Sequence, residues 1–75
     1  MERYQDLSGD SGVYAFEIGD DSITVEFKGG ATYLYNYAST GREYTEKMKV
    51  LALSGDGLNS YINKYVKNMY ASKLR

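Results

Sequence analysis

The residues best suited to chemistry in this sequence are four basic side chains and one tyrosine near its C-terminus: Lys64, Lys67, Tyr70, Lys73 and Arg75. Lysine and arginine neutralise phosphates, and a tyrosine beside them can stack on a nucleobase, so the set is typical of a nucleic-acid surface. The alternative interpretation is a solvated helix face whose basic end complements the helix dipole. We take RNA binding as the hypothesis because residues 57–75 carry four positive charges and no negative ones.

The side chains on which most catalysis depends are absent or badly spaced. The sequence has no His and no Cys, which removes the usual neutral-pH base, the usual zinc ligand and any thiolate. Glu17, Asp20 and Asp21 lack the spacing of a calcium loop and suit a hairpin turn instead. Gly29-Gly30 and Gly55-Asp56-Gly57 match no phosphate-binding fingerprint, and no nucleophile elbow is present. We therefore expect a non-enzymatic protein with no catalytic residue, no metal and no cofactor.

Length and charge limit the fold that positions these residues. The chain has 75 residues, 43% of them apolar, and a formal net charge of −1. Such a length supports a single domain with one modest core. Residues 1–27 carry seven acids and one base, whereas residues 28–75 carry eight bases and three acids. This segregation predicts either a basic binding face or attraction between the two halves of the fold.

Hydropathy gives no sign of a membrane segment. No apolar run approaches the roughly 20 residues that span a bilayer, and the first residues contain no apolar stretch of the signal-peptide type. We therefore expect a cytoplasmic protein with no membrane partner, and no feature predicts a small-molecule substrate.

Alternating apolar residues predict three strands of an antiparallel meander, which cover residues 13–18, 23–28 and 31–37. Between the first two strands, residues 19–22 have the composition of a turn. A four-residue turn there places Phe16 opposite Val25 and Tyr14 opposite Phe27. All of these apolar side chains then share one face of the sheet.

The loop before the third strand decides where its tyrosines point. Gly29-Gly30 is typical of a hairpin. With a two-residue loop, Tyr33, Tyr35 and Tyr37 lie on the open face, where single-stranded nucleic acid can stack on them. A three-residue loop with a Gly bulge reverses the parity and turns them toward the core. The sequence leaves both registers open; we favour the core register because so small a chain needs its large aromatic residues for burial.

A helical period follows the third strand. Thr40 and Glu43 have the spacing of a capping box, and residues 42–54 carry one apolar stripe. Val50 and Leu53 fall on the opposite side of this helix. We expect them to pack within the chain, the alternative being a small contact with a partner protein.

A second helix is expected from about Leu58 to Leu74, after Gly55 ends the first. This helix carries the basic residues and Tyr70. The predicted protein is thus a loosely ordered leader of residues 1–11 and one α+β domain of residues 12–75. Within the domain, a three-stranded antiparallel meander is followed by two helices packed on one face, in the order βββαα.

Two stretches of the chain resemble the KTSC domain, a short module found alone or at the C-terminus of some bacterial lysyl-tRNA synthetases. The first is Ser11-Gly12-Val13 followed by residues 23–35, where aliphatic-x-Phe, a Gly turn and Tyr-x-Tyr occur in the family's order. The second is Ala52 with the run Gly55-Asp56-Gly57-Leu58-Asn59-Ser60-Tyr61-Ile62. The chain departs from the family at Asn36-Tyr37-Ala38-Ser39, where Val-Pro is frequent.

The resemblance implies the order of the elements and a bacterial-type, RNA-related role, and it supplies no catalytic residue. It also marks Tyr33, Tyr35 and Asn59 as important to the fold or to a surface. We therefore expect a small binding module whose partner is RNA, tRNA in particular, held by a basic C-terminal helix with neighbouring tyrosines. The alternative is a protein–protein interaction domain that uses the free edge of the sheet or the Val50/Leu53 patch.

Overall fold

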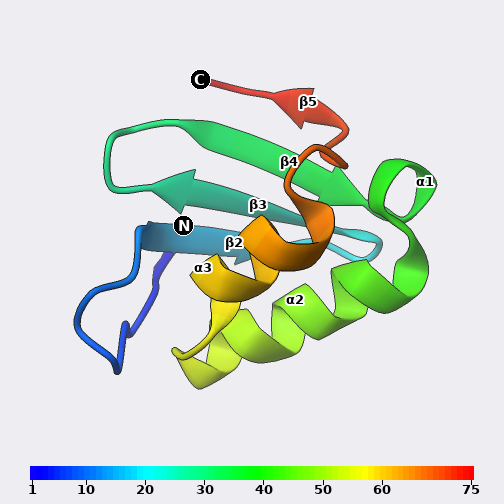
Figure 1. Cartoon of the computed structure of the whole chain (residues 1–75). Helices are drawn as coiled ribbons and strands as arrows, with labels where there is room; N and C mark the ends of the chain where they lie inside the picture. Colours follow the sequence, from blue (N-terminus) through cyan, green and yellow to red (C-terminus); the bar gives the residue numbers. More distant parts are fainter.

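A computed structural model describes all 75 residues and shows a five-stranded antiparallel sheet with helices packed on one face (Figure 1). The strands lie side by side in chain order, β1 to β5. The elements are β1 (Glu2–Arg3), β2 (Val13–Ile18), β3 (Ser22–Phe27), β4 (Thr32–Asn36), α1 (Tyr37–Thr40), α2 (Arg42–Ser54), α3 (Leu58–Tyr61), the π-helical turn η1 (Ile62–Val66) and β5 (Ser72–Lys73). The α+β class is confirmed. The βββαα arrangement is not, since four strands precede the helices and a fifth follows them.

The first hairpin follows the predicted register except at its open end. Phe16 lies opposite Val25 as expected, but Val13, and not Tyr14, lies opposite Phe27. The cause is a bulge between Val13 and Ala15, which inserts one residue into β2. Tyr14 is consequently turned outward and is 39% exposed, while Val13 takes the core position.

The second hairpin has the core register. Phe27 donates its backbone N–H to the Ala31 carbonyl at 2.8 Å, so the loop contains three residues. Gly30 has φ +98° in this loop, a conformation that glycine adopts without steric cost. Tyr33 therefore pairs with Val25, and Tyr35 lies opposite Ile23 with only 1% of its surface exposed. Tyr37, expected at the end of the third strand, begins α1 instead.

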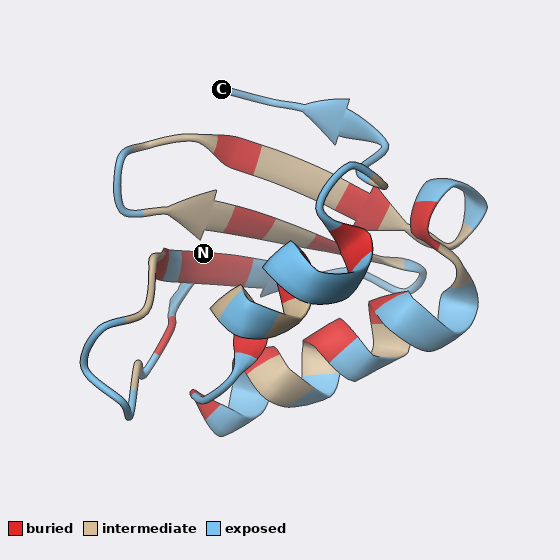
Figure 2. Cartoon of the chain, in the orientation of Figure 1, coloured by how far each residue is buried: buried red, intermediate tan, exposed pale blue.

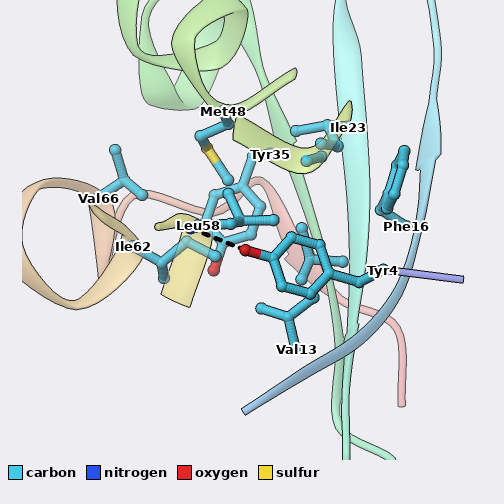
Figure 3. Packing of buried hydrophobic residues seen from close by; sticks show 11 residues of the cluster. Tyr4, Val13, Phe16, Ile23, Tyr35, Met48, Leu58, Ile62 and Val66 are labelled. Carbon is cyan, nitrogen blue, oxygen red and sulfur yellow. Dashed lines mark hydrogen bonds between the residues drawn. The ribbon is translucent and has the colours of Figure 1, made fainter. Parts of the chain in front are cut away.

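The expected loose leader of residues 1–11 contributes both a strand and a core side chain. Arg3 pairs with Ala15 along β2, and Tyr4 is buried in the main hydrophobic cluster (Figure 3). Asp6 links this segment to the sheet. Its carboxylate accepts hydrogen bonds from the Ser11 N–H at 3.0 Å and from Lys28 Nζ, directly after β3, at 2.9 Å. A domain of this size gains a large aromatic ring for its core by ordering this segment.

Helix α2 matches the predicted range, but its expected cap does not form. Thr40 ends α1, where its Oγ1 donates a hydrogen bond to the Met69 carbonyl at 2.7 Å. Gly41 stands at the N-cap of α2 and offers no side chain. At the other end, Gly55 adopts the left-handed conformation and its N–H caps the helix, as predicted.

The last helix is much shorter than predicted. Helical structure stops at Val66, and residues 72–73 form β5 along the outer edge of β4. Backbone hydrogen bonds explain this change: Ala71 N–H donates to the Leu34 carbonyl at 2.6 Å and Leu74 N–H to that of Thr32 at 2.7 Å. These bonds satisfy polar groups that the edge of β4 would otherwise leave unpaired. A basic C-terminal helix is thus wrong for the residues after Val66.

The core lies between the sheet and the helices, and the outer sides of the helices are exposed (Figure 2). Met48 and Ala52 face the sheet from α2. Val50 and Leu53 were expected to pack within the chain. Instead, they lie on the outer side of α2, with 59% and 57% of their surface exposed. No helix combines the length and apolar character needed to cross a membrane.

Candidate functional site

An aromatic pocket lies where the C-terminal segment meets the ends of β3 and β4. Its cavity is about 320 Å³ in volume. The sheet supplies its floor, η1 supplies one wall, and the loop between η1 and β5 supplies another. The lining residues are Phe27, Ala31, Tyr33, Tyr35, Ile62, Asn63, Lys67, Asn68 and Tyr70. We call this the aromatic pocket.

The rings of the aromatic pocket meet edge to face. Tyr33 contacts Tyr70 at 4.7 Å between ring centroids with 79° between the planes, and Phe27 at 5.9 Å with 88°. Tyr35 makes a similar contact with Tyr70 at 6.5 Å. In each such pair the edge of one ring packs against a face of the other. Tyr35 is only 1% exposed, whereas Tyr70 is 37% exposed, so Tyr70 is the ring of the pocket most accessible to a planar group.

The charge of the pocket is positive. Lys67 is the one charged residue of its lining. Lys73 adds a second ammonium, since its Nζ lies 5.9 Å from the centre of the Tyr33 ring. That position follows from the pairing of β5 with β4, which sets Lys73 directly opposite Tyr33. Aromatic faces beside two cations suit a ligand that is both planar and anionic.

Burial changes the acidity of the Tyr35 hydroxyl. Removal from water raises the pKa of Tyr35 to about 12, and the neighbouring hydroxyls of Tyr33 and Tyr70 add to the shift. The phenol is neutral at physiological pH, as an ordinary tyrosine also is, and adds no negative charge to the pocket.

Three of the five residues predicted to bind nucleic acid meet at this pocket. Lys67 and Tyr70 line it, and Lys73 stands at its edge. Their proximity does not come from a shared helix. It comes from the turn after Val66, which brings the chain back along β4.

The other two predicted residues lie elsewhere. Lys64 extends over the ring of Tyr65, with 5.4 Å between Nζ and the ring centroid. Tyr65 belongs to a separate cluster with Tyr44 and Tyr61. Arg75 lines a different cavity together with residues that include Glu26. The structure thus divides the predicted basic surface into three places.

Sequence reasoning missed part of the lining. Asn63 and Asn68 were not among the residues predicted to form a binding surface. Both residues line the aromatic pocket. The only signal was the spacing of Asn63 and Lys67, four residues apart and hence on one side of a helix.

The acidic residues do not form a metal centre. No group of three or more His, Cys, Asp or Glu side chains converges in the chain. Asp20 acts through its backbone, because its carbonyl accepts a hydrogen bond from Lys49 Nζ at 2.9 Å. Lys49 also pairs with Glu46 at 2.8 Å, and Glu46 accepts a hydrogen bond from the Tyr37 hydroxyl. The bond from Lys49 ties the first hairpin to α2, and the bond from Tyr37 ties α1 to α2.

No protein-family model, curated protein or solved structure matches this chain. The similarity to the KTSC domain therefore stays a prediction from the residues quoted above.

Proposed function

We propose that this domain is a non-enzymatic module that binds single-stranded RNA at the aromatic pocket. The observation that carries the proposal is a cavity lined by four aromatic rings whose only charged lining residue is a lysine. One base stacks on the rings, and the flanking phosphates approach Lys67 and Lys73. Stacking on aromatic side chains accepts any base, and lysines neutralise the backbone.

Single strands fit this site better than duplexes. The bases of a duplex are stacked on one another, so none can enter a pocket without unpairing. A loop or a free end presents a base that is already exposed. The resemblance to a module joined to lysyl-tRNA synthetases makes tRNA, with its single-stranded loops and end, the first RNA to test.

The test is an amide NMR titration of ¹⁵N-labelled protein with pooled tRNA and with an unstructured oligonucleotide, at about 50 and 200 mM salt. We expect shifts at β4 and at residues 63–73, strongest at low salt because phosphate contacts release counterions. A spectrum that does not move at low salt would overturn the proposal.

A matched pair of charge reversals locates the site. Lys67→Glu removes the lining cation and should weaken binding by about tenfold. Lys47→Glu makes the same change of net charge on the exposed side of α2, outside the pocket, and should leave affinity within about twofold. Equal losses in both variants would point to a general effect of charge and would contradict a pocket-centred site.

A partner protein at the Val50/Leu53 patch is the second candidate, and the exposure of both side chains on α2 favours it. The free sheet edges first considered are already covered, because β1 pairs with β2 and β5 pairs with β4. Two-residue edge strands are a common protection against further pairing. A partner held by Val50 and Leu53 would be lost in a Val50→Ser/Leu53→Ser variant and would bind with little dependence on salt.

A further inference from the structure

We infer that the aromatic pocket is a one-nucleotide site in which Asn63 and Asn68 read the edge of the bound base. The inference rests on the proposed function and adds to it the size of the bound unit and the residues that determine specificity.

The volume of the pocket sets the size of the bound unit. Small-molecule sites span roughly 300 to 1,000 Å³, and this cavity is about 320 Å³. It lies at the lower end of that range, where a single base with its sugar partly outside fills the space. Two stacked bases would require a longer groove of rings, and the four rings here contact one another edge to face and leave no such groove between them.

The two asparagines are placed to recognise that base. Asn63 lies in η1 and Asn68 in the turn that follows it, and both line the cavity. Each amide offers a donor and an acceptor, the combination that base edges match. The side-chain hydrogen bonds of the chain involve other residues, so both amides are free to bind a ligand.

The same segment places a cation beside the amides. Lys67 follows Asn63 by one helical turn and precedes Asn68 directly, and all three line the pocket. A phosphate on Lys67 therefore lies next to the base that the amides contact. No acidic side chain lines the cavity to oppose it. Base recognition and phosphate binding are thus combined within residues 63–68.

The inference is tested with the four 5′-ribonucleoside monophosphates and with ribose 5-phosphate as the ligand that lacks a base. We expect the nucleotides to shift the side-chain amide signals of Asn63 and Asn68, with affinities that differ among the four. Ribose 5-phosphate should bind at least about fivefold more weakly, because it cannot stack. In Asn63→Ala or Asn68→Ala, the preference for the best base over the worst should fall by about fivefold or more.

The pattern of outcomes distinguishes failure of this inference from failure of the proposed function. Nucleotide-dependent shifts with a preference that collapses in an asparagine variant support it. Oligonucleotide binding at the pocket without mononucleotide binding, or with equal affinity for all four bases, overturns the inference and leaves RNA binding standing. Binding of neither ligand overturns both. Both asparagines are exposed, and an unchanged backbone spectrum for each variant shows that it has folded.

Discussion

The hydroxyl of Tyr4 accepts a hydrogen bond from the backbone N–H of Leu58 across 3.2 Å, and this bond joins residues 54 positions apart in the chain (Figure 3). Leu58 is the first residue of α3, and the N-cap residue Gly57 provides no side-chain cap. The first N–H groups of a helix have no partner within it. Tyr4 therefore caps α3 from the N-terminal segment while its ring fills the core.

Two substitutions at Tyr4 should separate its packing from its hydrogen bond. Tyr4→Phe keeps the ring and leaves the buried Leu58 N–H without a partner, which should lower the free energy of unfolding by about 1–2 kcal/mol. Tyr4→Ala also removes the ring and should cost about 3 kcal/mol or more. Urea denaturation followed by circular dichroism measures both. Similar small losses in the two variants would show that the ring adds little to the core.

Substitution of Gly55 should destabilise the fold much more than substitution of Gly29. Gly55 has φ +76°, and an added Cβ would lie 2.6 Å from Gln5 Cβ. Gly55→Ala should therefore cost on the order of 2 kcal/mol, from strain and from displacement of the N-terminal segment. Gly29 lacks a positive φ and has open space around it, so Gly29→Ala should change the stability by less than about 0.5 kcal/mol. Thermal unfolding of the two variants compares them directly.

Tyr35 should make the stability fall at high pH. Burial raises its pKa from 10.0 to about 12, so the folded protein holds the phenolic proton more tightly than the unfolded chain does. The resulting stabilisation is complete below pH 10 and is lost as the pH rises from 10 to 12. Tyr35→Phe removes this contribution, and its unfolding free energy should fall less than that of the native chain over that interval. Equal slopes for the two proteins would contradict the assignment to Tyr35.

Asp6 should make the stability fall at low pH. Its hydrogen bond to Lys28, followed by the one from the Ser11 N–H, lowers the pKa of its carboxyl below 3.8. A lowered pKa means that the stabilisation is present above about pH 4 and is lost as the pH falls through the folded value. Asp6→Asn suits the control, because asparagine tolerates the φ of +54° at this position. The difference in unfolding free energy between the two proteins should shrink in acid, and a constant difference would disprove the role of the carboxylate.

The parts of the fold that follow from local patterns were predictable. Residues 13–36 alternate and turn at glycine and aspartate, and their two hairpins formed with the core register. The bulge between Val13 and Ala15 could not be predicted from the sequence, because it shifts one side chain without altering the composition of the strand. The edge strands β1 and β5 have two residues each, which is too short for an alternation of apolar and polar residues to be recognised in the sequence. The end of the last helix was misplaced because residues 67–71 contain no Gly or Pro, and only the edge of β4 turns the chain there.

Some residues of the candidate site were predictable, and their position in the fold was not. Basic residues beside a tyrosine indicated phosphate and base contacts, and Lys67, Tyr70 and Lys73 do lie together. Phe27 and Tyr33 supply further rings, and the placement of Tyr33 depended on the parity of one hairpin loop. A continuous helix over residues 58–74 would not place Tyr70 beside those rings, because the contact requires the chain to turn back along β4.

Tyr70 couples the pocket to the edge of the sheet. Its ring forms a wall of the cavity, and the next residue makes the backbone bond that begins the attachment of β5 to β4. If β5 detaches, that wall and the Lys73 ammonium leave together. Binding of a ligand in the aromatic pocket is therefore coupled to the docking of β5 on β4. Its occupancy would slow hydrogen exchange at Ala71 and Leu74 in proportion to ligand concentration, although it touches neither amide.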